Sequence, residues 1–204
     1  MSATNPASRL EAFCDGVFAI ALTLLIIDIK IPSTEKINST ADFWLALKHI
    51  APSISAFILS FIIILITWVN HHNSLKLGNK LSSAFIYANG FLLLTVVFMP
   101  FPTSLLGEYI MTDHASPAVI LYDSTMALQA LGWTLMTRTA LKDRLAKDEK
   151  AALHIRKNSK YSNYGFVLYS SFAIIAIWFP LAAAIVTTLT WIFWLIHGIS
   201  IKHE

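Results

Sequence analysis

Six long runs of apolar residues divide this chain, and polar segments or prolines separate them. Each run is close to the length of about 20 mainly apolar residues that a helix needs to cross the hydrocarbon core of a bilayer. The sequence therefore predicts an all-α integral membrane protein with six transmembrane helices in a single domain, residues 1–204. The predicted spans are residues 9–31, 43–70, 83–106, 118–141, 164–179 and 181–201.

The composition agrees with a membrane protein. Hydrophobic residues make up 56% of the chain and charged residues only 13%, whereas a soluble domain carries about 25% charged residues. Cys14 is the one cysteine, so no intrachain disulfide can form. The net charge of +3 does not call for a nucleic-acid partner, because the placement of the basic residues has a membrane explanation.

The distribution of lysine and arginine predicts the orientation, because positively charged loops stay in the cytoplasm. With six spans, both termini and the second and fourth loops share one side. Twelve of the 15 Lys and Arg residues fall on that side, and three (Lys30, Lys36 and Lys48) fall on the other. We therefore expect a multi-pass protein of the cell membrane with both termini cytoplasmic. The loop at about 142–160 is expected to be a helical extension beside anionic lipid headgroups.

Three ionisable side chains interrupt the start of the first apolar run: Arg9, Glu11 and Asp15. Charge at that depth is costly, so it is usually paired inside the bundle and linked to function. One interpretation is a structural ion pair between Arg9 and Asp15. Near the other end of the run, Asp28 suggests either an acidic ring at an outer mouth or, as we favour, a solvated helix end paired with Lys30.

The opposite face of the first predicted helix is apolar. At 100° per residue, one stripe contains Phe13, Gly16, Ile20, Leu24, Ile27 and Ile31, with Thr23 on its flank. Asp15 lies on another face. Taken alone, such a stripe indicates helix packing or lipid contact, because nearly every membrane helix has one.

Further polar residues lie in the second, third and fourth runs. Adjacent His71 and His72 point about 100° apart on a helix and so make a poor metal site, and no metal or cofactor is expected. One histidine is expected to pack inward and to hydrogen-bond the polar start of the first helix. Asn89 is expected to join that network, whereas Asp123 is interpreted as interfacial. No arrangement of catalytic residues is visible, so an enzyme is not expected.

These residues together resemble the bacterial homologues of the endolysosomal potassium channel family called transmembrane protein 175. The family signature is Arg-x-x-x-Phe-Ser-Asp at the start of the first helix, and this chain has Arg9, Phe13 and Asp15 with Cys14 in place of the serine. The resemblance covers the first three spans and only the general pattern of the last three. Its other matching segments are ALTLLIIDIKIP, Ser60-Phe61, Trp68-Val69-Asn70-His71-His72, Asn89 and Pro100-Phe101-Pro102-Thr103.

The resemblance implies a homotetramer in which four first helices line a central pore and act as a hydrophobic gate. Its partners would be copies of itself, membrane lipids, and potassium and other monovalent cations that permeate rather than serve as cofactors. The expected function is a passive channel modestly selective for potassium over sodium. A proton-coupled secondary transporter that uses Asp15, Glu11 and His71 or His72 is the alternative. The implied pore residues are Ile20, Thr23, Leu24 and Ile27, and the implied structural network is Arg9, Phe13, Asp15, His71, His72 and Asn89.

Overall fold

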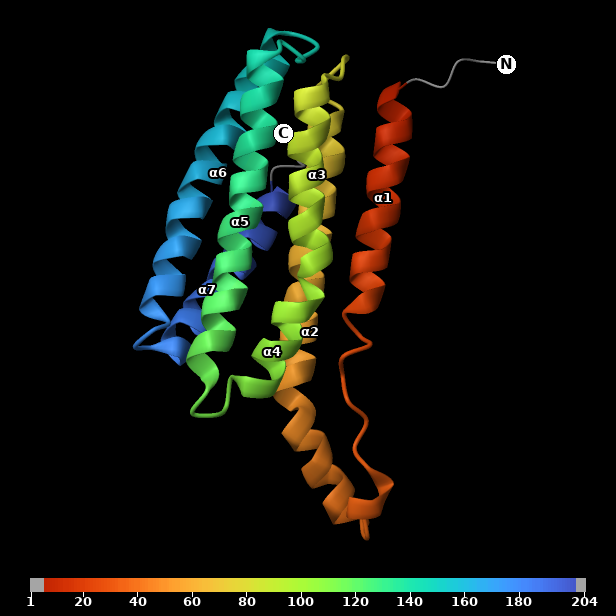
Figure 1. The fold of residues 1–204 in the computed structure, drawn as a ribbon, viewed down its shortest axis with the longest axis vertical. Coiled ribbons are helices and arrows are strands. Elements are labelled where there is room, and N and C mark those ends of the chain that lie inside the picture. Colours follow the sequence, from red (N-terminus) through yellow and green to blue (C-terminus); the bar gives the residue numbers. More distant parts are fainter. Residues whose placement is uncertain (1–5, 201–204) are drawn as a thin grey trace, which may run out of the picture.

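The computed structural model describes the backbone of residues 6–200 and the side chains of residues 7–35 and 37–192. Ile201, the last residue of the sixth predicted span, lies outside the described residues, as does Lys202. The predicted all-α class is confirmed for the described part (Figure 1). In chain order the helices are α1 (Pro6–Leu24), the short 3₁₀ helix η1 (Thr34–Lys36), α2 (Thr40–Leu75), α3 (Ser83–Phe98), α4 (Pro100–Tyr109), α5 (Ala115–Lys142), α6 (Glu149–Ile175) and α7 (Pro180–Ser200).

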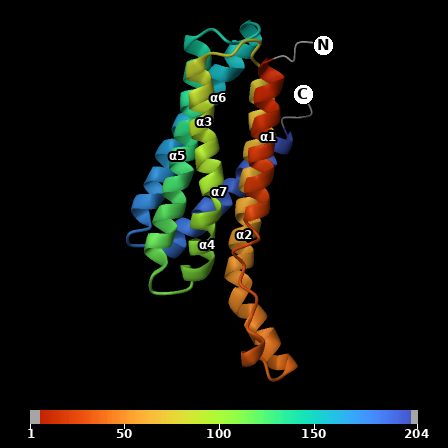
Figure 2. The ribbon, with the colours of Figure 1, turned by 45° about the vertical axis from the view of Figure 1, so that its right-hand side comes forward.

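The helices form an elongated bundle with α1 at its edge (Figures 1 and 2). α1 contacts α2 and α3, while α5 lies between α3 and α6. α7 crosses behind the bundle and contacts α2, α5 and α6. The first turns of α2 project beyond the other helices, together with the chain that precedes them. One face of α1 is thus packed, while its other face is left without a partner in the single chain.

Polar side chains begin three of the helices. The side-chain oxygens of Ser39, Ser82 and Asp148 accept hydrogen bonds from backbone N–H groups in the first turns of α2, α3 and α6, at 3.1, 3.2 and 2.7 Å. They satisfy donors that have no partner within the helix. Asp148 explains why α6 begins at Glu149, well before the predicted fifth span. The predicted helical extension is therefore the first part of α6.

The first helix ends earlier than its apolar run. α1 stops at Leu24, and the chain continues in tighter turns, with Ile27 N bonded to Leu24 O and Ile29 N bonded to Ile26 O, both at 3.2 Å. β-branched residues have lower helix propensity, and Pro32 disfavours helical geometry in the residue before it. The β-branched residues after Leu24 favour the end of the helix there, and Pro32 disfavours a return to helix just before it, although the hydrophobic pattern continues.

The predicted third run is divided into α3 and α4. Pro100 and Pro102 lack the backbone N–H that would continue the hydrogen-bond ladder. Thr103 compensates in part, because its backbone N–H and its hydroxyl both donate to Met99 O, at 3.1 and 2.8 Å. The chain therefore keeps its course across the break, and the stretch Ser83–Tyr109 remains long and apolar enough to cross a membrane.

Within the described residues, two helical stretches are long and apolar enough to span a bilayer, Thr40–Leu75 and Ser83–Tyr109. A shorter apolar helix covers Pro180–Ile192. α1 is not among them, and its 19 residues include three charged side chains near the start. The helix that the sequence marks as functional is therefore not one of the helices that are apolar enough to sit in lipid alone.

Candidate functional site

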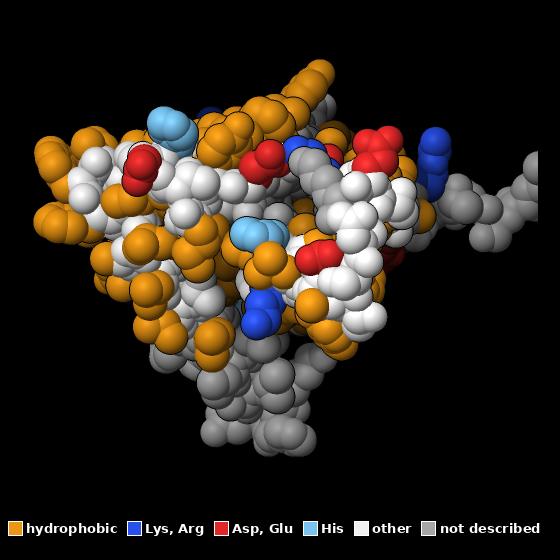
Figure 3. All heavy atoms as spheres, turned by 90° about the horizontal axis from the view of Figure 1, so that it is seen from below, with side chains coloured by type: hydrophobic (Ala, Val, Ile, Leu, Met, Phe, Trp, Pro, Cys, Tyr) orange, Lys and Arg blue, Asp and Glu red, His pale blue; other side chains and the backbone are white. Residues whose placement is uncertain are grey.

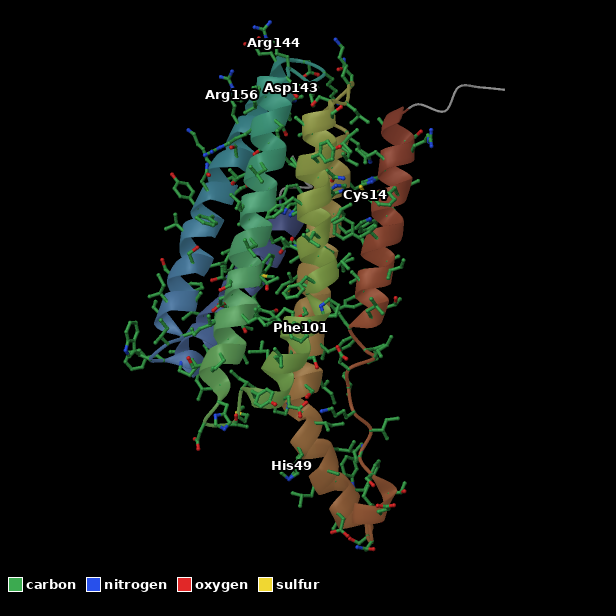
Figure 4. The ribbon with its side chains drawn as sticks, in the orientation of Figure 1. Cys14, His49, Phe101, Asp143, Arg144 and Arg156 are labelled. Atoms are coloured by element: carbon green, nitrogen blue, oxygen red, sulfur yellow. The ribbon has the colours of Figure 1, made fainter. Side chains whose placement is uncertain are left out.

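The buried face of α1 and of the residue that follows it consists of four small or apolar residues: Cys14, Phe18, Ala21 and Leu25. Each is at most 2% exposed. Their spacing of three or four residues places them on one side of a helix, and they belong to a core cluster shared with α2 and α3. In Figure 4, Cys14 lies between α1 and the neighbouring helices. This face fixes the rotation of α1 about its axis.

The opposite face carries the predicted stripe. Phe13 is 63% exposed, Ile20 58% and Ile27 70%. Leu24 is 37% exposed, and Thr23 is exposed as well. All four residues implied as pore-lining therefore lie on the unpacked side of the first helix and the turn that follows it.

The Thr23 hydroxyl has a defined direction. It donates to the backbone carbonyl of Ile20 at 2.9 Å, one turn back along α1. Because a hydroxyl has one hydrogen and two lone pairs, its oxygen remains available as an acceptor on the exposed side. Thr23 is the one oxygen-bearing side chain among the four implied pore residues.

A buried chain of hydrogen bonds ties α1 to α2 and α3. Asn89 Nδ2 of α3 donates to Cys14 Sγ at 3.3 Å, and His71 Nε2 of α2 lies 2.6 Å from Asn89 Oδ1. An amide oxygen can only accept, so His71 Nε2 is the donor. The His71 ring lies between Phe18 and Trp133, with ring centroids at 5.4 and 6.2 Å. Burial of all three polar groups makes this chain rigid.

A second set of contacts joins the start of α1 to α2. Trp68 Nε1 donates to Asp15 Oδ1 at 2.8 Å. His72 Nδ1 lies 2.8 Å from Glu11 Oε1, an ion pair when the imidazole is protonated, and the geometry is not that of a hydrogen bond. The Trp68 and His72 rings stack at 6.1 Å. Both carboxylates of α1 therefore have partners on α2.

Four of the six residues predicted for the structural network meet in this region: Asp15, His71, His72 and Asn89. Arg9 and Phe13 are exposed in the single chain. The Arg9–Asp15 ion pair is absent among the described side chains, whose ion pairs are Lys30–Glu108 and His72–Glu11. Asp15 is held by Trp68 instead.

Sequence reasoning missed two partners in this network. Cys14 was considered only as a departure from the family serine, yet its sulfur accepts from Asn89. Trp68 was noted only as part of a segment that matches the family. The sequence could have indicated its role, because Trp68 lies three residues before His71 and residues three apart on a helix share a face.

The far end of α1 leads to a polar cavity of about 210 Å³ between the chain after α1 and helices α2 and α4. Asp28 lines this cavity. The pair between Asp28 and Lys30 that we favoured from the sequence is not formed. Lys30 Nζ instead contacts Glu108 Oε2 of α4 at 2.6 Å, and this carboxylate raises the pKa of Lys30. Figure 3 views this end, where a few charged and histidine side chains are scattered among hydrophobic ones.

The described residues contain no group of three or more His, Cys, Asp or Glu side chains placed to hold a metal.

Comparisons with known proteins find relatives of this chain. The family model described as the endosomal/lysosomal potassium channel TMEM175 matches residues 9–100. A potassium channel of Chamaesiphon minutus is 38% identical over 186 residues, which cover 89% of this chain and 91% of the relative. A potassium channel of Streptomyces collinus is 37% identical over 185 residues, covering 88% of each chain.

Solved structures show the same fold. The crystal structure of a lysosomal potassium-selective channel TMEM175 homologue from Chamaesiphon minutus matches with a TM-score of 0.78 and 33% identity, covering 93% of this chain and 97% of that chain. A variant of the potassium channel MtTMEM175, in complex with a nanobody fusion, matches with a TM-score of 0.65 and 17% identity. The second likeness concerns the fold alone.

Proposed function

This chain belongs to the TMEM175 family, which consists of ion channels rather than enzymes, and we propose that it is a potassium channel of the cell membrane. Four copies would surround a central pore, each contributing six membrane-spanning helices. The names of its bacterial relatives support potassium as the permeant ion.

The two-faced burial of α1 is the observation that most supports a pore on this helix. Its rotation is fixed by one packed face, while isoleucines on the other face are more than half exposed. A four-fold assembly would place these exposed residues around the axis. Such a helix also carries charged residues that are costly in lipid, so an inner position suits it better than the periphery.

The proposed constriction consists of rings of Ile20 and Ile27, with Thr23 and Leu24 between them. Apolar rings gate by excluding water, so an ion must shed part of its hydration shell to pass. Potassium holds that shell less tightly than sodium, which favours its passage. Four Thr23 oxygens, available as acceptors, would replace part of the lost hydration. This scheme leads to modest selectivity for potassium.

The network behind α1 would hold the constriction in place. The Cys14–Asn89–His71 chain and the Trp68–Asp15 bond both fasten the first half of the helix to α2 and α3. If α1 rotated about its axis by one residue, about 100°, the neighbours of the isoleucines would face the pore in their place. The buried hydrogen bonds oppose such a rotation.

Basic side chains support a cytoplasmic position for the N-terminus, and we propose the same side for the C-terminus. The N-terminal end of α1, the loop before α3 and the loop between α5 and α6 lie at the same end of the bundle (Figure 1), where Figure 4 marks Arg144 and Arg156. Anionic lipid headgroups of the inner leaflet attract such clusters. The polar cavity with Asp28 would then face the outside.

A flux assay tests the function directly. The purified chain in liposomes is expected to conduct potassium down its gradient, to conduct sodium less well, and to need no proton gradient. Uptake that requires a proton gradient would instead favour the transporter that uses Asp15, Glu11 and His71 or His72. Absence of any flux from a folded tetramer would contradict the channel proposal.

Cross-linking tests the pore position separately. A disulfide requires Cβ atoms about 4 Å apart, and the proposed pore brings the Ile27 positions of neighbouring subunits close together. In a Cys14→Ser background, Ile27→Cys is therefore expected to form disulfides between subunits on oxidation. Leu25→Cys, on the buried face of the same region, is the matched control and should remain uncrosslinked. Monomers from both variants after oxidation would contradict the proposed axis.

A further inference from the structure

Asp123 is a fully buried carboxyl group that takes no part in the α1 network. It lies on α5 and is 0% exposed, so the interfacial position expected from the sequence is wrong. Its Oδ1 accepts a hydrogen bond from Thr187 Oγ1 of α7 at 2.8 Å. Its Oδ2 is buried and has no hydrogen-bond partner among the described residues.

The surroundings of this carboxyl do not suit a negative charge. The ion pairs among the described side chains involve other residues, so no cation faces it. Tyr122, the residue before Asp123, belongs to a hydrophobic core cluster that also contains the aromatic rings of Tyr169 and Phe172 from α6 and Trp191 from α7. An isolated carboxylate in such a place costs so much that it is neutralised by a proton instead. One threonine hydroxyl falls short of the two or three donors that stabilise a buried carboxylate.

The other ionisable groups nearby do not alter this balance. Tyr122, the preceding residue on α5, shares a hydrogen bond with Ser60 of α2 at 3.0 Å. Tyr169 of α6 stacks on Trp191 of α7, with ring centroids 5.8 Å apart. The described buried polar side chains of α3, α4 and α7 are neutral amides and hydroxyls. Among the described residues, two Asp, Glu, Lys, Arg or His side chains are buried: Asp123 and His71. His71 belongs to the α1 network.

We propose that Asp123 is a proton-binding site, and that the protonated carboxyl fastens α7 to α5 through Thr187. The proton would form an O–H bond on Oδ2, the oxygen left without a partner. When that bond breaks and the proton leaves to water, an uncompensated charge remains between packed helices. The contact between α5 and α7 is then weakened. Neither residue belongs to α1, so the inference does not depend on the proposed pore.

Thermal unfolding of the intact protein in lipid nanodiscs, from about pH 5 to about pH 9, tests the site. The unfolded chain releases the proton more readily than the folded chain does, so unfolding is favoured as the pH rises. The unfolding equilibrium of the wild type should shift by up to about tenfold per pH unit from this group. Asp123→Asn keeps a neutral side chain of similar shape, so this part of the pH dependence should disappear and stability at high pH should rise.

Two controls separate the proton from the helix contact. Thr187→Val removes the hydrogen bond but keeps the acid, so stability should fall at every pH while the pH dependence remains. Asp113→Asn removes an exposed carboxylate and should leave the wild-type profile unchanged. Identical pH profiles for wild type and Asp123→Asn would overturn the proposal.

Infrared spectroscopy covers the case in which Asp123→Asn does not fold. The wild type at neutral pH should show the carbonyl stretch of a buried, protonated carboxylic acid. Thr187→Val should shift this band, because the bond to Oδ1 is lost. A wild-type spectrum without such a band would equally overturn the proposal.

Discussion

At the scale of single residues, α1 is attached to α2 and α3 by buried polar side chains that have few other hydrogen-bond partners within reach. Asn89 lies at the centre, since its amide joins a thiol on α1 to an imidazole on α2. A buried donor that loses its acceptor cannot turn to water, so removal of one member costs more than the bond itself contributed.

Cys14 is the first place to test this dependence. Cys14→Ala leaves one Asn89 N–H without an acceptor, and we expect a loss of about 1–3 kcal/mol in the free energy of unfolding. Cys14→Ser is the matched control, because a hydroxyl accepts better than a thiol, and it should match the wild type. Chemical or thermal unfolding in detergent measures both variants. Equal stability of the alanine and serine variants would show that the sulfur contact contributes nothing.

Trp68 offers a second test. Trp68→Phe keeps an aromatic ring against His72 but removes the donor to Asp15, and hydrogen bonds to charged groups contribute about 1.5–3 kcal/mol. We expect a decrease of that order in stability, measured by thermal unfolding. Trp44→Phe, at a 64% exposed position on the same helix, should have little effect. A Trp68→Phe variant as stable as this control would argue against the anchoring role of Asp15.

The residue pattern alone predicted part of this network. The depths of His71 and Asn89 along their runs placed them near the polar start of the first helix, and the structure brings them together. The choice of partners was not predictable, because it depends on how α2 and α3 are rotated about their own axes. That rotation brings Trp68 to Asp15, whereas Arg9 lies six residues earlier on the same helix as Asp15 and on a different face of it.

At the scale of elements, close approach between helices requires small residues at particular points. Gly107 of α4 lies so near α2 that an added Cβ would be 2.6 Å from Ser53 Cα. That neighbour is backbone and cannot move aside as a flexible side chain would. Both residues also line the 210 Å³ cavity, so this contact forms part of its wall.

Gly107→Ala should therefore separate α4 from α2. Overpacking of this kind costs about 1–3 kcal/mol, which thermal unfolding would detect. Gly90→Ala is the matched control, because no atom lies within 4 Å of its added Cβ. That variant should be neutral or more stable, since alanine favours helix by about 1 kcal/mol. A stable Gly107→Ala variant would mean that the two helices are not held at this spacing.

Helix ends were harder to predict than helix existence. The break near Pro100 was readable because proline removes a backbone donor. The end of α1 at Leu24 was not, because the apolar stripe continues into the turns that follow. The helical extension before the fifth span was predicted, but its first residue was not, because that residue depends on the Asp148 cap within a charged segment.

At the scale of the whole molecule, the exposed face of α1 is the surface that the proposed assembly would cover. The all-helical fold could be read from the apolar runs, and family membership came from the first-helix motif. The proposed four-fold arrangement comes from the resemblance alone, because the sequence of one chain does not show how many copies assemble.

Replacing a proposed pore isoleucine by asparagine tests the assembly through its conductance. Ile20→Asn and Ile27→Asn should each raise conductance and move the potassium-to-sodium permeability ratio toward one, because a polar ring retains water. Bilayer recordings measure both quantities. Ile26→Asn, off the proposed stripe, is the matched control and should keep the wild-type ratio. Unchanged ratios in both pore variants would place the constriction elsewhere.

Helix α2 has a consequence that follows from its length alone. Its 36 residues extend about 54 Å, well beyond a hydrocarbon core of about 30 Å, and its first turns project past the bundle (Figure 1). In a four-fold assembly these turns would form a collar standing in the aqueous phase. An approaching cation would meet the charges of that collar, Asp42 and Lys48 among them, before it reached the level of the lipid.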